Sequence, residues 1–262
     1  MPDNKHVLIT GATGAIGKSI ARMIAVIEGY YVTILGRDEN KTKRVQEELV
    51  RASGNENIDY VLCDLSRKTE IISLAESWDK PLHVLVNNAA VTPRRREKTP
   101  EGIEMQWATN VLGYFWMMKH FAHILEKYAP ARIVNVASYW AGDLDLNDPE
   151  FKQRHYNNDT AYRQSKQADR MLTVAFALRL ASKNITVNAC HPGDVRSTLA
   201  SNLGYGGHES PDQGAATPVW VATSPELKGM NGKYFEHRQE SRCYFGENQQ
   251  QVEALFALCE KT

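Results

Sequence analysis

The chain has 262 residues, of which 31 are basic and 31 acidic, so it carries no net formal charge. With 24% charged and 42% hydrophobic residues, it has an ordinary soluble composition and enough length for one large α/β domain with a buried core. The charge balance gives no electrostatic case for binding nucleic acid or an anionic membrane, and no apolar run is long enough to predict a membrane span.

The N-terminal residues lead directly into a strand-like segment, so we expect no signal peptide. The four cysteines, Cys63, Cys190, Cys243 and Cys259, are widely scattered and show no metal-ligand spacing. We therefore expect reduced thiols in a cytoplasmic protein, and no metal site.

Short apolar runs alternate with helical patterns along the whole chain. Strands are predicted at residues 6–9, 31–35, 58–63, 83–86, 132–137, 185–190 and 233–235. Helices are predicted at 16–27, 40–52, from near 66, 103–127, 160–182, 211–222 and 249–260. This alternation predicts an α/β fold with a doubly wound parallel sheet, helices on both faces, and a single domain over residues 1–262.

A glycine-bearing turn, TGATGAIG at residues 10–17, follows the first predicted strand and opens the first helix. Such a turn brings backbone amides up to phosphate oxygens, and the positive end of the helix dipole adds to the attraction. Glycine is needed where a side chain would block a pyrophosphate. The position of the turn therefore favours dinucleotide binding.

The first charged residue after the second strand is Arg37, and Asp38 follows it directly. An arginine here accommodates the 2′-phosphate of NADP, whereas an acidic residue favours NAD, so NADP(H) is favoured over NAD(H). Lys18 could add a second positive charge. Asp64, after the third strand, could accept from an adenine amino group or cap the helix that begins near Ser66.

Tyr162 stands four residues before Lys166, and on a helix this spacing puts both side chains on one face. A free phenol titrates near ~10, and a neighbouring ammonium stabilises the phenolate and lowers that pKa. Such a tyrosine can give a proton to a carbonyl oxygen or take one from an alcohol. Alone, the pattern also fits two ordinary residues of an amphipathic helix, so its context decides.

Small residues and flexible loops surround the expected site. The segment 87–90, Asn-Asn-Ala-Ala, ends the fourth strand, where small side chains let a cofactor lie flat. Substrate-pocket residues are expected from 92–100, from the stretch between Ser138 and Tyr162, and from 199–213, which has no periodicity and suits a mobile lid.

Taken together, the glycine turn, Asp64, the 87–90 segment, Ser138, the Tyr162–Lys166 pair and the turn at 192–193 resemble the short-chain dehydrogenase/reductase family, over nearly the whole chain. The resemblance implies a Rossmann-type sheet of seven parallel strands, a nicotinamide cofactor and an Asn-Ser-Tyr-Lys catalytic group. That group is carried here by Asn110, Ser138, Tyr162 and Lys166. The cofactor-binding residues that it implies are Gly11, Thr13, Gly14, Ala15, Ile16, Gly17, Arg37, Asp64, Leu65, Asn88, Ala89, Tyr162, Lys166, Pro192, Gly193 and Val195.

The resemblance also implies roles for the catalytic group. Ser138 holds the substrate oxygen, Tyr162 is the proton donor in reduction, and Lys166 lowers its pKa and bonds the nicotinamide ribose. Asn110 holds a water that links Lys166 to solvent. The substrate is a small or medium carbonyl or alcohol, partly apolar in character.

Two departures from the family pattern keep alternatives open. The first is in the glycine turn, where Ala15 replaces a usual glycine and Gly14 gives the spacing of the branch that contains sugar-nucleotide epimerases and dehydratases. The second is Ala90, which also replaces a usual glycine. Within the family the chain is most similar to the retinol dehydrogenase and WW-domain oxidoreductase group. A catalytically silent NADP(H)-binding regulator is the other alternative. The helices at 103–127 and 160–182 form dimer faces in many relatives, so a homodimer or homotetramer is expected.

Overall fold

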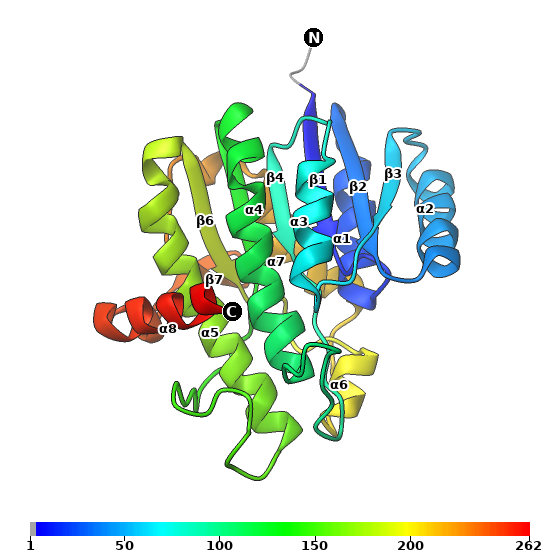
Figure 1. The fold of residues 1–262 in the computed structure, drawn as a ribbon. Coiled ribbons are helices and arrows are strands. Elements are labelled where there is room, and N and C mark those ends of the chain that lie inside the picture. The colour runs from blue at the N-terminus through cyan, green and yellow to red at the C-terminus, as the bar shows by residue number, and fades with distance from the viewer. Residues whose placement is uncertain (1–3) are drawn as a thin grey trace.

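Residues 4–262 are described by a computed structural model, and their strands form one eight-stranded sheet in the order β3-β2-β1-β4-β5-β6-β7-β8 (Figure 1). The strands are β1 Lys5–Thr10, β2 Tyr30–Gly36, β3 Ile58–Leu62, β4 Val84–Asn87, β5 Ala131–Val136, β6 Ile185–Cys190, β7 Tyr234–Glu236 and β8 Gln239–Ser241. Strands β1 to β7 pair in parallel, as predicted, and β8 adds an antiparallel edge strand beside β7.

Strand β8 was missing from the predicted elements because its sequence carries no strand signal. Its three residues are polar and largely exposed. The turn before it uses His237 and Arg238, both with left-handed φ values of 48° and 61°. Hairpin turns of this kind usually carry asparagine and glycine, so a His-Arg pair does not announce one.

For most of the helix ends, the observed and predicted boundaries differ by only a few residues. The α-helices are α1 Ala15–Ala25, α2 Glu39–Ser53, α3 Lys68–Glu76, α4 Gly113–Lys127, α5 Asn158–Leu180, α6 Thr198–Asn202, α7 Pro211–Thr223 and α8 Gln249–Lys261. Short 3-10 turns lie at Ala181–Lys183, Pro225–Leu227 and Tyr244–Gly246. Within residues 4–262, no helix combines the length and apolar character that crossing a membrane requires.

Two stretches differ from the expected pattern. The helix expected at 103–127 contains a π-helical turn, Trp107–Leu112, before α4 begins. Such turns are frequent at functional sites, and this one carries Asn110. The stretch expected to be an aperiodic lid begins within α6, whose five residues are too few to show a helical period.

The sheet is covered on both faces, and each face has its own apolar core. Helices α3, α4, α5 and α8 pack on one face, and α1, α2 and α7 on the other (Figure 1). Along β4, Val84 and Val86 belong to the second core and Leu85 to the first, as the two-residue period of a strand requires. The sheet order reverses between β1 and β4, the place where such folds form their ligand crevice.

Helix α8 packs over α4 and α5, the two long helices that were expected to form a subunit interface. The Phe256 ring lies 5.1 Å from the Phe115 ring and 5.3 Å from the Phe176 ring, between centroids. An ion pair of 2.5 Å between Arg179 and Glu253 ties α8 to α5. Part of the expected interface is therefore covered by the chain itself.

Candidate active site

A cleft of about 660 Å³ lies at the carboxyl ends of the parallel strands. Each of the sixteen residues predicted to bind a cofactor lines it. Of the four predicted catalytic residues, Ser138, Tyr162 and Lys166 line the cleft and Asn110 does not. The fold therefore brings together segments that are more than a hundred residues apart in the sequence.

The glycine turn supports one wall of the cleft, and its glycines are needed for different reasons. Gly11 has a φ of 64°, and a Cβ there would lie 2.7 Å from the Ala89 Cα. A Cβ on Gly17 would lie 2.4 Å from the Gly11 carbonyl oxygen and 2.6 Å from the Asn88 Nδ2. These two glycines are required by close packing within the protein, whereas Gly14 is exposed and a Cβ there would meet its nearest atom at 3.4 Å.

The turn is also held by hydrogen bonds from the end of β4. The Thr10 hydroxyl accepts from the Asn88 and Ala89 backbone N–H groups at 2.9 and 3.1 Å. The Asn88 side-chain amide donates to the Thr10 carbonyl at 2.9 Å. These contacts hold the turn against the neighbouring strand.

The residues present fit a bound dinucleotide. Helix α1 begins after Gly14 without a side-chain cap and with no acidic residue in its first turn, so its N–H groups are available to an anion at the cleft. Arg37 and Asp64 line the same cleft as Tyr162 and His191, which suits a long ligand.

Basic side chains line the cleft near the end of β2, although they are not the pair that was predicted. Arg37 and Lys41 are exposed and line the cleft. Lys18 does not line it, because its ammonium pairs with Glu48 on α2. The carboxylate of Asp38 accepts from the Lys41 backbone N–H at 2.7 Å and caps α2.

Asp64 lines the cleft and shapes the chain after β3. Its Oδ1 accepts from the Ser66 backbone N–H at 3.0 Å and from the Ser66 hydroxyl at 2.8 Å. The N-cap position of α3 is Arg67, so Asp64 does not cap this helix. Its side chain instead stabilises a turn just before the helix.

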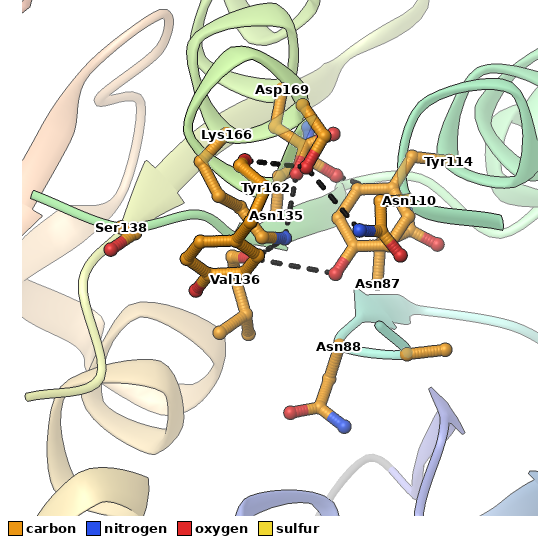
Figure 2. A network of polar contacts seen from close by, with 12 residues as sticks. Asn87, Asn88, Asn110, Tyr114, Asn135, Val136, Ser138, Tyr162, Lys166 and Asp169 are labelled. Atoms are coloured by element: carbon orange, nitrogen blue, oxygen red, sulfur yellow. Dashed lines mark hydrogen bonds and ion pairs between the residues drawn. The ribbon is translucent and has the colours of Figure 1, made fainter. Parts of the chain in front are cut away.

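Tyr162 and Lys166 lie on one face of α5, as their spacing predicts, with Ser138 beside them after the end of β5 (Figure 2). The Lys166 Nζ lies 5.9 Å from the Tyr162 ring centroid and donates to the Val136 carbonyl at 3.1 Å. The Ser138 hydroxyl accepts from the Trp140 backbone N–H at 3.0 Å, which sets its direction. A phenol, an ammonium and a hydroxyl thus meet in one cleft.

The net pKa of Tyr162 differs from the prediction. Burial raises it above its ordinary value, while the Lys166 ammonium and the Ser138 hydroxyl act to lower it. The predicted direction of the lysine effect is confirmed, but the predicted net lowering is wrong in this structure because desolvation of the phenolate is the larger effect. A phenol of this kind is protonated at neutral pH.

His191 also lines the cleft, and sequence reasoning assigned it no role. Burial lowers its pKa to about 4, with smaller contributions from the positive charges of His237 and Arg170. Its ring packs edge-on against Tyr139, with centroids 4.6 Å apart. A neutral imidazole is a weak proton donor, so His191 is poorly suited to act as an acid near neutrality.

Asn110 is fully buried in the π-helical turn and contacts a loop. Its Oδ1 accepts from the Val91 backbone N–H at 2.8 Å, and its Nδ2 donates to the Val91 carbonyl at 3.0 Å. The same Nδ2 lies 3.3 Å from the Ser165 hydroxyl. The side chain therefore holds the loop after β4 in place, and its predicted link to Lys166 through a water stays a prediction.

Other lining residues were not predicted individually, because their positions depend on loops and on long-range packing. The aromatic residues Tyr139, Trp140 and Tyr205 come from two of the predicted pocket segments, and Trp140 and Tyr205 lie 5.0 Å apart between ring centroids. Met105 and Thr109 lie before α4, outside any predicted pocket segment. Asp169, which pairs with Lys166, carried no recognisable signal in the sequence.

Comparison with known proteins gives consistent results. The short chain dehydrogenase family profile matches residues 5–205. A Streptomyces antibioticus protein named as an oxidoreductase is 35% identical over 94% of this chain and 89% of its own. Human retinol dehydrogenase 13 is 31% identical over 88% of this chain and 76% of its own. A crystal structure of an uncharacterized Mycobacterium paratuberculosis protein matches with a TM-score of 0.83 and 26% identity, over 99% of this chain and 93% of that one.

The predicted likeness to retinol dehydrogenases is thereby confirmed at the level of sequence. The family match covers the glycine turn, the Tyr162 and Lys166 helix and the segment after β6, which are the parts that form the cleft. The chain therefore belongs to the short-chain dehydrogenase/reductase family, whose members bind nicotinamide cofactors, and it is an NAD(P)-dependent oxidoreductase.

Proposed function

We propose that this protein is an NADP(H)-dependent reductase of carbonyl compounds, or dehydrogenase of the matching alcohols, with Tyr162 as general acid and base. The observation that carries the proposal is the meeting of Tyr162, Lys166 and Ser138 in a cleft whose other wall is the glycine turn. A bound nicotinamide supplies the hydride that is exchanged with the carbonyl carbon.

The chain's own residues would then handle the substrate oxygen. Ser138 donates a hydrogen bond to that oxygen, and Tyr162 delivers its proton to it in reduction. Because burial raises the pKa of Tyr162, the phenol is fully protonated near neutrality and ready to act as an acid. The reverse reaction needs the phenolate, so alcohol oxidation should speed up as the pH rises. Lys166 stabilises that phenolate.

The residues that line the cleft near the end of β2 support the preference for NADP(H). Arg37 and Lys41 place two positive charges beside the end of β2, where a 2′-phosphate would lie. The acidic neighbour Asp38, which would favour NAD, is engaged as the cap of α2. Both observations favour the phosphorylated cofactor.

The substrate end of the cleft supports a partly apolar carbonyl compound. Besides the aromatic residues Tyr139, Trp140 and Tyr205, it is lined by Leu199 and Leu203. Apolar and aromatic walls with a few convergent polar groups are typical of small-molecule sites. A small or medium, partly apolar aldehyde or ketone is the substrate class that we propose.

Purified protein tests the proposal directly. With NADPH and a panel of aldehydes and ketones, it should consume the cofactor, and NADH should serve less well. Tyr162→Phe should lose about 10²- to 10⁴-fold in kcat, the usual contribution of a general acid, while NADPH binding measured by fluorescence is retained. A Tyr162→Phe protein that turns over like the parent would refute the role of Tyr162.

The same experiment separates the alternatives. Tight NADPH binding with no turnover of any carbonyl would indicate a silent regulator instead. Retained NAD and conversion of a UDP-sugar would indicate an epimerase or dehydratase.

Domain organisation, location and assembly are also proposals. One sheet joins segments from both ends of the described chain, which supports a single domain. Four free cysteines agree with a reducing, cytoplasmic location. Because α8 packs over α4 and α5, we expect any homodimer or homotetramer to use other surfaces. Light scattering of the Phe256→Ala variant beside the parent protein tests this expectation. If the subunits instead met through α4 and α5, loosening α8 would strengthen their association.

A further inference from the structure

Asp169 is a fully buried carboxylate one turn after Lys166 on α5. Its Oδ2 lies 2.8 Å from the Lys166 Nζ, and the exposed fractions of the two side chains are 0% and 2%. The other oxygen, Oδ1, has no hydrogen-bond partner among residues 4–262. Figure 2 shows the two side chains directed toward one another beside Tyr114. A buried ion pair with one oxygen left unsatisfied is costly.

The titratable groups coupled electrostatically to Asp169 come from three helices, α4, α5 and α8. They are Lys166 and Tyr162 on α5, Tyr114 on α4 and Cys259 on α8. Burial raises the pKa values of the two phenols and the thiol, so these groups are uncharged near neutrality. Lys166 supplies the positive charge, and it faces Cys190 on β6 as well.

The backbone at Asp169 is held in place from the sheet. Its carbonyl accepts from the Thr173 hydroxyl at 2.8 Å, and that hydroxyl accepts from the Asn135 Nδ2 at 2.9 Å. The Asn135 Oδ1 in turn accepts from the Asn87 Nδ2 at 2.9 Å. This buried network joins β4, β5 and α5 and anchors the stretch of helix backbone from which the Asp169 carboxylate projects.

We propose that Asp169 is a positioning residue for the reaction: its carboxylate holds the Lys166 ammonium beneath Tyr162 and offsets part of the positive charge that Tyr162 experiences. The proposal rests on the proposed function, because it assigns Asp169 a part in the chemistry of Tyr162. The Lys166 Nζ also lies 5.0 Å from the Tyr114 ring and 5.9 Å from the Tyr162 ring, so its position is shared between the two phenols.

Asp169 and Lys166 act on Tyr162 in opposite directions. The Lys166 ammonium lowers the pKa of Tyr162, and the Asp169 carboxylate raises it. Burial raises the pKa of Asp169 to about 7, against the lowering effect of Lys166, so the carboxylate is charged in the alkaline range where a phenol titrates. Asp169 therefore keeps Tyr162 protonated to a higher pH.

The substitution Asp169→Asn tests the charge and leaves the shape. The amide oxygen can still accept from Lys166, so the ammonium should stay where it is. The pH at which the Tyr162 phenolate appears should fall by about one unit. The measurement is near-ultraviolet phenolate absorbance, with the Tyr162→Phe titration subtracted. The alkaline rise of alcohol oxidation should move down with it.

The matched control is Glu253→Gln. Glu253 on α8 is the exposed partner of Arg179, which lies on the same helix as Asp169, α5. This substitution should leave the phenolate titration and the pH profile unchanged. An unchanged midpoint in Asp169→Asn, or an equal shift in Glu253→Gln, would overturn the role of Asp169. The phenolate titration needs no substrate, so it is distinct from the test of the function, which fails if Tyr162→Phe retains activity.

A second measurement covers the case in which Asp169→Asn does not fold. In the parent, carbon-13 spectra of labelled aspartate should show one carboxyl that titrates near neutrality, far above an ordinary aspartate at ~3.9. In Lys166→Met that midpoint should move up while the other carboxyl midpoints stay. Spectra without any such carboxyl, or without a response to Lys166→Met, would overturn the proposal.

Discussion

The cleft has a proposed phosphate end at the glycine turn and a proposed reaction end at Tyr162, Lys166 and Ser138, and the two ends are built in different ways. At the phosphate end, backbone segments approach so closely that Gly11 and Gly17 have no room for a side chain. At the reaction end, the Lys166 and Asp169 side chains carry opposite charges inside the core. The first end therefore depends on space and the second on charge, so the two should fail in different ways when they are altered.

Lys166→Met should cause the largest change, at the reaction end. It leaves the Asp169 carboxylate buried without a cation, which should cost about 3–5 kcal/mol of unfolding free energy near pH 8. The loss should be smaller near pH 5, where Asp169 can accept a proton. Urea unfolding at the two pH values measures both. The control Lys119→Met, in an exposed pair with Glu260, should lose no more than about 1 kcal/mol at either pH.

The direction of this pH dependence follows from the raised pKa of Asp169. Its folded value of about 7 lies above the unfolded value of ~3.9. A carboxyl raised in this way contributes stability that is fully present below the unfolded value and is lost as the pH rises through the folded one. Without Lys166 the folded pKa rises further, so the loss extends to higher pH. Equal losses near pH 5 and pH 8 would contradict a titrating Asp169.

Gly17→Ala should have the next largest effect, at the phosphate end. The new methyl group would meet backbone and side-chain atoms at 2.4 and 2.6 Å, so the fold should lose about 1–3 kcal/mol through overpacking, at any pH. Gly14→Ala should lose less than about 1 kcal/mol, because its methyl group has room. It should weaken NADPH binding instead. Thermal unfolding and fluorescence titration separate the two effects, and equal stability losses would refute the distinction.

Arg37→Gln should have the smallest effect, confined to one cofactor. Loss of a charge-assisted bond to a 2′-phosphate should raise the KM for NADPH about tenfold, or ~1.4 kcal/mol, and leave NADH unchanged. Lys18→Gln is the control, because Lys18 pairs with Glu48 away from the cleft. Steady-state kinetics with both cofactors measure the change. A similar response to the two substitutions would show that the charge at this end acts without a specific contact.

The cleft as a whole could be predicted from sequence with unusual completeness. Every predicted cofactor-binding residue lines it: most sit at the carboxyl end of a parallel strand or at the start of the helix that follows, and Tyr162 and Lys166 lie on one face of α5. Asn110, a predicted catalytic residue, does not line the cleft, since its turn is π-helical and its amide is engaged with Val91. Strand β8 and helix α6 were too short to show a period.

What the sequence determined by itself is the order of strands and helices and the residues at their junctions. Those depend on local backbone geometry and on apolar periodicity, which a linear chain carries openly. Only the tertiary structure decided the electrostatics of the site: that Asp169 is buried against Lys166, that the pKa of Tyr162 is raised, and that Lys41 and not Lys18 faces the groove. The reason is that desolvation and charge pairing depend on which distant segments cover a side chain, and no local pattern records that.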